Sequence, residues 1–162
     1  PPRAAETSLD VEEDALIPAE YVGNNVERLN LYRRIAEADG PKPLEELRVE
    51  LRDRFGPVPD PVEHLLIGAE MRLLAQRLRL ARVQFKNERL WLDTPEPEAD
   101  AYFYDTLFQP FLNRLETLGR RYVLKETGRK LRVIVQDVRT LEVARDVLAR
   151  LVPEADASSV PA

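Results

Sequence analysis

The spacing of apolar residues in the first half of the chain predicts three successive helices. Apolar positions recur every three or four residues, which is the period of an α-helix with one buried face. Asparagine, proline and glycine residues lie near the expected boundaries, where they cap or stop helices. The predicted helices span residues 24–38, 43–55 and 60–82.

The first and third of these helices differ in how much of their surface is apolar. In the first, Asn24 and Glu27 have capping-box spacing. Its expected buried stripe consists of Val26, Leu29, Tyr32, Ile35 and Ala36. The third helix is apolar over a wider arc, so we expect it to be central and packed between two layers.

In the second half of the chain, apolar and polar residues alternate over short runs that predict strands. Two hairpins are expected, with strands over 83–86 and 89–92 and over 122–126 and 130–135. Helices are expected over 100–118, with a kink or break at Pro110, and over about 137–151. An edge strand is expected within 8–17. This order predicts an α+β fold with a small, mostly antiparallel sheet covered by helices.

Length and composition fit a single domain. The 162 residues suit a single core, which we place at 8–152, after a linker end at 1–7 and before a disordered tail at 153–162. The chain begins with Pro1, so we expect a fragment of a longer protein. A formal charge of −5 gives no overall attraction to nucleic acid. No apolar run approaches the ~20 residues that span a bilayer, so we expect a cytoplasmic protein without membrane contact.

The sequence contains none of the common catalytic motifs. Phosphate-binding glycine loops, HExxH and GxSxG are absent. There is no cysteine, and His64 is the single histidine. We therefore expect no catalytic residue, no metal and no cofactor in this chain. An enzyme whose cleft cannot be seen in the sequence remains an alternative.

Acidic residues share one face of the second predicted helix. Glu46, Glu50 and Asp53 are three or four residues apart, on the side opposite the apolar stripe. Glu50 and Arg54 form an i,i+4 pair in the favourable order. Two interpretations follow: a solvated surface, or an acidic docking ridge for an arginine-bearing partner.

Basic residues gather in the second predicted hairpin. Six of them, less Glu126, leave five positive charges, and they are Arg120, Arg121, Lys125, Arg129, Lys130 and Arg132. These side chains could contact phosphate groups, but no recognition module accompanies them. Nucleic-acid contact therefore remains an alternative function.

Two longer segments resemble a known family. Residues 16–22 (LIPAEYV) and 27–36 (ERLNLYRRIA) are similar to the opening of the C-terminal TRCF domain of bacterial transcription-repair coupling factors. Residues 50–56 (ELRDRFG), running on to Pro59, resemble the second hallmark of that domain. The resemblance is strong over 8–82 and loose over 83–151.

The resemblance implies a non-catalytic, regulatory role. Members of that family are ATP-dependent DNA translocases that remove stalled RNA polymerase and recruit the excision-repair protein UvrA. Their terminal domain packs on an N-terminal domain like part of UvrB and masks its UvrA-binding surface. Such a domain is autoinhibitory, and its partners would be that N-terminal domain directly and UvrA, RNA polymerase and DNA through the parent protein.

The resemblance also suggests roles for individual residues. Glu50 and Asp53 match the hallmark, so we expect them to pair with arginines of the N-terminal domain, with Glu46 as an accessory. Arg54 either holds Glu50 or contacts the partner itself. Phe55 and Gly56 are expected to fix the helix end, and Tyr21, Arg28 and Tyr32 to pack and cap. A contact of hairpin 120–132 with nucleic acid or RNA polymerase, and a permanent structural cap, remain alternatives.

Overall fold

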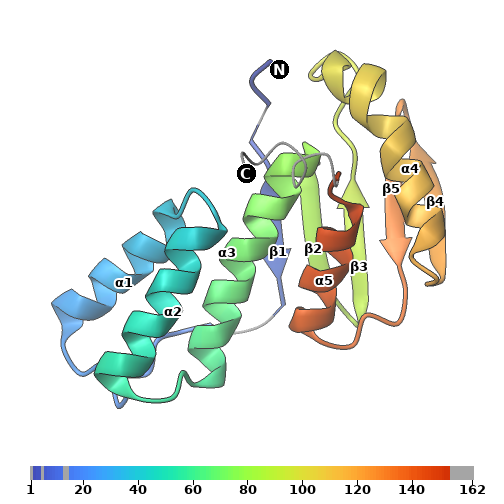
Figure 1. Cartoon of the computed structure of the whole chain (residues 1–162). Coiled ribbons are helices and arrows are strands. Elements are labelled where there is room, and N and C mark those ends of the chain that lie inside the picture. Colours follow the sequence, from blue (N-terminus) through green and yellow to red (C-terminus); the bar gives the residue numbers. More distant parts are fainter. Residues whose placement is uncertain (1, 5, 13–14, 154–162) are drawn as a thin grey trace, which may run out of the picture.

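The computed structural model of the chain describes residues 2–4, 6–12 and 15–153 and has the predicted α+β fold (Figure 1). The tail predicted to be disordered lies outside the described residues from residue 154 onward. The elements are β1 (Ser8–Val11), α1 (Asn25–Glu37), α2 (Pro41–Phe55), α3 (Asp60–Leu78), β2 (Arg82–Lys86), β3 (Arg89–Asp93), the π-helical turn η1 (Phe103–Leu107), α4 (Phe108–Thr117), β4 (Tyr122–Thr127), β5 (Lys130–Val135) and α5 (Leu141–Leu151).

The strands form one mostly antiparallel sheet, in the order β1-β2-β3-β5-β4. Among the described residues, β1 and β2 form the one parallel pair, and the other three strand pairs are antiparallel. Both predicted hairpins are present. The first turns at Asn87 and Glu88, which both have positive φ, as a two-residue hairpin turn matched to strand twist requires.

Helices α3, α4 and α5 cover one face of the sheet (Figure 1). Apolar side chains from these helices and from alternate strand positions, such as Val83, Leu92 and Val133, form the larger core cluster. Helices α1 and α2 pack instead against the other side of α3, where Leu31, Leu47 and other buried apolar side chains form a second cluster.

Helix α3 belongs to both clusters, as predicted for a central helix. Ile67 and Met71 point into the core beneath the sheet. Val62 and Leu66 point into the core shared with α1 and α2. All four side chains are buried to at least 99%, and burial of each contributes about 1.5–3 kcal/mol. The helix therefore joins the sheet to the α1–α2 pair.

Three helix boundaries differ from the prediction. Helix α3 ends at Leu78 rather than residue 82, because Arg79 adopts a left-handed conformation (φ 59°) and its N–H bonds to the carbonyls of the last turn. Helix α2 begins at Pro41 rather than Pro43, with the proline in the first turn, where its missing N–H costs nothing. Helix α5 begins at Leu141 rather than near residue 137, because Thr140 caps it.

Two further expectations concern irregular segments. The edge strand expected within 8–17 is limited to Ser8–Val11, and residues 13–14 lie outside the described part of the chain. No break into two helices occurs at Pro110: residues 101–117 are helical without interruption, and the irregularity is the π-helical turn η1, which gives way to α4 at Phe108, two residues earlier. Proline cannot donate the backbone hydrogen bond that a regular helix needs there.

The predicted buried stripe of α1 is only partly correct. Ile35 is buried, but Val26 and Leu29 are 65% and 63% exposed. Helix α1 lies at the edge of the molecule (Figure 1) and contacts the core through a narrow stripe that includes Leu31. Tyr32 is half-buried against the second core cluster, whereas Val26, Leu29 and Ala36 are exposed.

Candidate docking surface

Helices α1 and α2 are connected by a network of ion pairs, which consists of Glu27, Arg34, Glu50 and Arg54. The Arg34 guanidinium donates to both carboxylate oxygens of Glu50, at 2.8 and 3.1 Å. Arg54 donates to Glu50 at 3.4 Å and also to Glu27. The predicted pair of Glu50 and Arg54 is confirmed, but Arg34 is the closer partner of Glu50.

The ion-pair network is solvent-accessible and therefore weak. The side chains of Arg34 and Glu50 are 48% and 35% exposed, and pairs of this kind contribute about 0.2–1 kcal/mol each. The hydrogen bond from Arg34 is the main cause that lowers the pKa of the Glu50 carboxyl below its usual value. Glu50 is thus ionised and fixed in position.

The other two carboxylates of the predicted acidic ridge remain available. Glu46 and Asp53 are exposed on the outer side of α2, seven residues apart, which is two helical turns. Neither forms an ion pair with another residue in the described part of the chain. In the described part of the chain, the ridge therefore consists of two carboxylates without an ion pair, those of Glu46 and Asp53, beside that of Glu50, which pairs with Arg34 of α1.

The C-terminal end of α2 is fixed by Tyr21. Its hydroxyl donates to the carbonyls of Leu51 and Gly56, at 3.2 and 3.0 Å, and its ring lies 5.7 Å from that of Phe55. The expected packing and capping roles are confirmed. Gly56 has the expected positive φ of 89°, but its ψ of −168° is extended rather than left-handed helical.

The segment before α1 is held by two other residues that the resemblance selected. Arg28 donates to the carbonyl of Val22 at 2.6 Å. The Tyr32 hydroxyl accepts from the N–H of Ile17 at 2.7 Å. Their expected packing and capping roles are also confirmed, and the first family segment is thereby fixed against α1.

The basic hairpin is less positive than its sequence suggests. Ion pairs join it to neighbouring acidic residues, namely Arg121 with Asp137, Arg129 with Glu98, Lys130 with Glu96, and Arg132 with Asp93. Counting these four carboxylates reduces the surplus of five charges to one. Arg120 donates to the carbonyl of Asp137 at 3.1 Å. The hairpin is therefore a mixed surface, because its partners come from outside residues 120–132.

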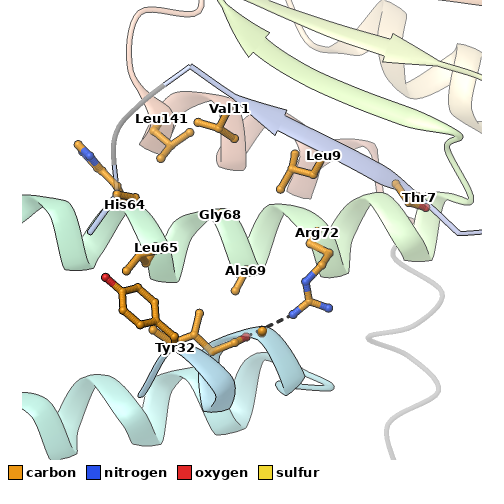
Figure 2. A pocket seen from close by; sticks show the side chains of 13 residues that line it. Thr7, Leu9, Val11, Tyr32, His64, Leu65, Gly68, Ala69, Arg72 and Leu141 are labelled. Atoms are coloured by element: carbon orange, nitrogen blue, oxygen red, sulfur yellow. Dashed lines mark hydrogen bonds between the residues drawn. The ribbon is translucent and has the colours of Figure 1, made fainter. Parts of the chain in front are cut away.

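A cavity of about 550 Å³ lies between β1, α1 and α3 (Figure 2). Most of its lining is apolar, with Leu9 and Val11 above α3 and Leu65 on that helix. Arg72 lies at one side and donates to the carbonyls of Ile35 and Ala38, at 3.4 and 3.3 Å. None of the described lining residues is Asp or Glu, so they provide no carboxylate pair for general acid–base catalysis.

The described residues contain neither a metal-binding cluster nor a membrane-spanning helix. Among residues 2–4, 6–12 and 15–153, no group of three or more His, Asp or Glu side chains could hold a metal ion. Over the same residues, no helix has both the length and the apolar character needed to cross a bilayer.

Comparison with solved structures defines the class of this fold. The model is similar to the crystal structure of the C-terminal domain of a transcription-repair coupling factor, with a TM-score of 0.69 and 23% identity. The match covers 93% of this chain and 96% of that one. The chain therefore has the fold of that α+β domain.

Sequence comparison establishes the family. A family model described as the TRCF domain matches residues 11–103, more than half of the chain. The chain belongs to the TRCF domain family. The transcription-repair-coupling factor of Haemophilus influenzae is 41% identical over 78 residues (48% of this chain and 7% of the relative). That of Bacillus subtilis is 30% identical over 131 residues (81% of this chain and 11% of the relative). The chain thus spans about a tenth of these relatives.

Proposed function

We propose that this chain is a non-catalytic regulatory domain of a transcription-repair coupling factor. In this proposal, the domain docks on the N-terminal UvrB-like domain of its parent protein and masks the surface that UvrA binds. The parent is an ATP-dependent DNA translocase that acts on stalled RNA polymerase. Release of the domain exposes the UvrA site.

The observation that carries the proposal is the state of the carboxylates on α2. Glu46 and Asp53 are exposed and have no ion pair within the described residues, although 24 basic residues are distributed along the chain. Two uncommitted carboxylates on one helix face complement a partner that carries arginines, since guanidinium and carboxylate groups pair with high geometric specificity.

The buried side of α2 gives the surface its rigidity. Leu44, Leu47 and Leu51 fix the helix in the second core cluster, so α2 presents Glu46 and Asp53 in a fixed geometry. Arg34 and Arg54 hold the Glu50 carboxylate between the two helices. A partner arginine would have to share Glu50 with Arg34. We therefore assign the main contacts with the partner to Glu46 and Asp53 and a supporting contact to Glu50. Arg54 positions the Glu50 carboxylate. Several exposed pairs of ~0.2–1 kcal/mol suit an interface that must open.

The test is charge reversal in the full-length parent protein, with UvrA binding measured in the absence of RNA polymerase. Glu46→Arg combined with Asp53→Arg should raise UvrA affinity well above the wild-type level, because the reversed charges repel the partner arginines. These substitutions leave the Arg34–Glu50 pair intact, and circular dichroism checks the fold.

The matched control carries the same change in charge at a distant site. Glu116 and Glu126 are exposed on α4 and β4, so Glu116→Arg with Glu126→Arg should leave UvrA binding unchanged. If the α2 variant binds UvrA no better than this control, the proposed masking surface is wrong.

A further inference from the structure

The face of the sheet opposite α3, α4 and α5 is basic. Strand residues alternate between the two faces, and those on the helix-covered face are apolar apart from Glu126. No helix of the described residues packs on the other face, which we call the open face (Figure 1). Its strand positions carry six basic and two acidic residues, namely Arg82, Lys86, Arg89, Lys125, Lys130 and Arg132, with Asp10 and Asp93. This face is therefore positive, although the chain has a formal charge of −5.

Trp91 lies at the centre of the open face. The strand register places it in one row with Ile134 of β5 and Val123 of β4. The Lys86 Nζ lies 5.4 Å and the Arg132 Cζ 5.7 Å from the centroid of the Trp91 ring. Residues two positions apart on a strand are separated by about 7 Å, so these cations come from the rows on either side. An apolar row that contains an aromatic ring thus runs between two basic rows.

Half of the basic residues on the open face are not paired with acidic residues. Within the described residues, ion pairs join Arg82 to Asp10, Lys130 to Glu96 and Arg132 to Asp93. Lys86, Arg89 and Lys125 form none in the same part of the chain, and Arg89 and Lys125 are exposed. Their charges are therefore available to an anion from outside.

The Trp91 ring is not held by a hydrogen bond of its own. Its indole N–H is buried and has no acceptor within the described residues. The ring is instead contacted by the cations of Lys86 and Arg132. An anion that draws these two side chains away would uncover the ring.

We propose that the open face binds single-stranded nucleic acid, with phosphate groups on the two basic rows and a base stacked against Trp91. The site uses both hairpins, because Lys86 and Arg89 belong to the first and Lys125 to the second. It therefore differs from the contact that the sequence suggested for residues 120–132 alone. It also lies on other elements than the α1–α2 surface, so it does not depend on the masking function.

The physical argument is the combination of charge and an aromatic ring. Sites for single strands join a positive surface, which follows the phosphate backbone, to aromatic side chains on which bases stack. The bases of a duplex already stack on one another and cannot cover a tryptophan ring. The position of Trp91 between basic rows therefore favours a strand with unpaired bases over a duplex.

The test uses the fluorescence of Trp91, which is the single tryptophan of the chain. The 162-residue chain is titrated with oligothymidylate and oligouridylate of about 12 nucleotides. Saturable quenching by either one is expected, and the affinity should fall as the salt concentration rises. Thymidine monophosphate, a duplex of the same length and vesicles of anionic phospholipid should quench much less. Equal quenching by any of these three, or no saturable quenching by the single strands, would overturn the proposal.

Charge variants test the basic rows by the fluorescence anisotropy of a labelled oligonucleotide. Arg89→Glu with Lys125→Glu should lower the affinity at least about tenfold. The matched control is Arg33→Glu with Arg52→Glu, at exposed positions of α1 and α2 without an ion pair in the described residues. If the two double variants bind equally, the open face is not the site.

A third variant tests the stacked base. Trp91→Leu keeps an apolar side chain beside Ile134 and removes the aromatic ring, so the affinity should fall about tenfold. Thermal unfolding shows whether the sheet is intact. If Trp91→Leu binds like wild type while the variant of Arg89 and Lys125 does not, charge alone holds the ligand and the assignment to unpaired bases is wrong.

Discussion

A single hydroxyl group connects the two segments that identify the family. Tyr21, in the first segment, donates to two carbonyls of the second, those of Leu51 and Gly56. The sequence could suggest a packing role for Tyr21, because it is aromatic and precedes a helix. It could not identify the acceptors, which lie 30 and 35 residues away and meet Tyr21 only in the folded chain.

Removal of that hydroxyl should weaken the fold moderately. Tyr21→Phe keeps the ring against Phe55 but leaves two carbonyls without this donor, so we expect a loss of about 0.5–1.5 kcal/mol in the free energy of unfolding. Urea denaturation measures it. Tyr102→Phe is the control, since no hydrogen bond of the Tyr102 hydroxyl occurs within the described residues. Equal stabilities of the two variants would contradict the capping role.

Gly68, within α3, is a position where a substitution should stabilise the domain. In the described part of the chain, apart from the backbone of α3 itself and the two neighbouring residues, no heavy atom lies within 4 Å of a Cβ added to Gly68, which lines the cavity of Figure 2. Because glycine is a poor helix former, Gly68→Ala should stabilise the domain by about 0.5–1 kcal/mol. Thermal unfolding measures the change. Gly56→Ala, at φ 89°, should destabilise it, and a loss of stability in Gly68→Ala would show that the open space is required.

At the scale of elements, the ion pairs between α1 and α2 make stability depend on pH. Glu50 has a lowered pKa in the folded state, first because Arg34 donates to it. Its pair therefore contributes stability above the unfolded pKa of about 4.3. That contribution is lost as the pH falls through the lower folded pKa.

The prediction is a difference between variants below pH 4.5. Between pH 7 and pH 3, wild type should lose up to about 1 kcal/mol more unfolding free energy than Glu50→Gln, which has no carboxylate to protonate. Urea denaturation at several pH values measures the difference. Glu46→Gln, whose carboxylate has no ion pair in the described residues, should follow wild type. Parallel curves for wild type and Glu50→Gln would show that the pair contributes nothing.

The elements show why sequence reasoning succeeded locally and failed at longer range. Asn24, Pro41 and the Asn87–Glu88 turn act through their immediate neighbours, so local rules locate helices and hairpins to within a few residues. The left-handed Arg79 has no such local signal, and the extent of α3 was overestimated. Arg34 was missed as a partner of Glu50 because 16 residues separate them.

At the scale of the molecule, patterns along the chain were less informative than the arrangement of its elements. The α+β class follows from the order of helices and hairpins, and it was predicted correctly. The sequence overestimated the positive charge of the basic hairpin, because Asp93, Glu98 and Asp137 lie outside the hairpin in sequence but pair with its arginines in the fold. Likewise, helical spacing alone could not show that Val26 and Leu29 face outward, since that depends on the position of α1 at the edge.

The central position of α3 has a consequence for how the domain responds to force and to binding. Its opposite faces are built into two cores, so neither the α1–α2 pair nor the sheet can separate from it without exposing a row of apolar side chains. The domain therefore behaves as one cooperative unit. A partner bound to α1 and α2 would therefore be coupled mechanically to the strands through α3. Force applied to the sheet would reach the α1–α2 surface by the same helix.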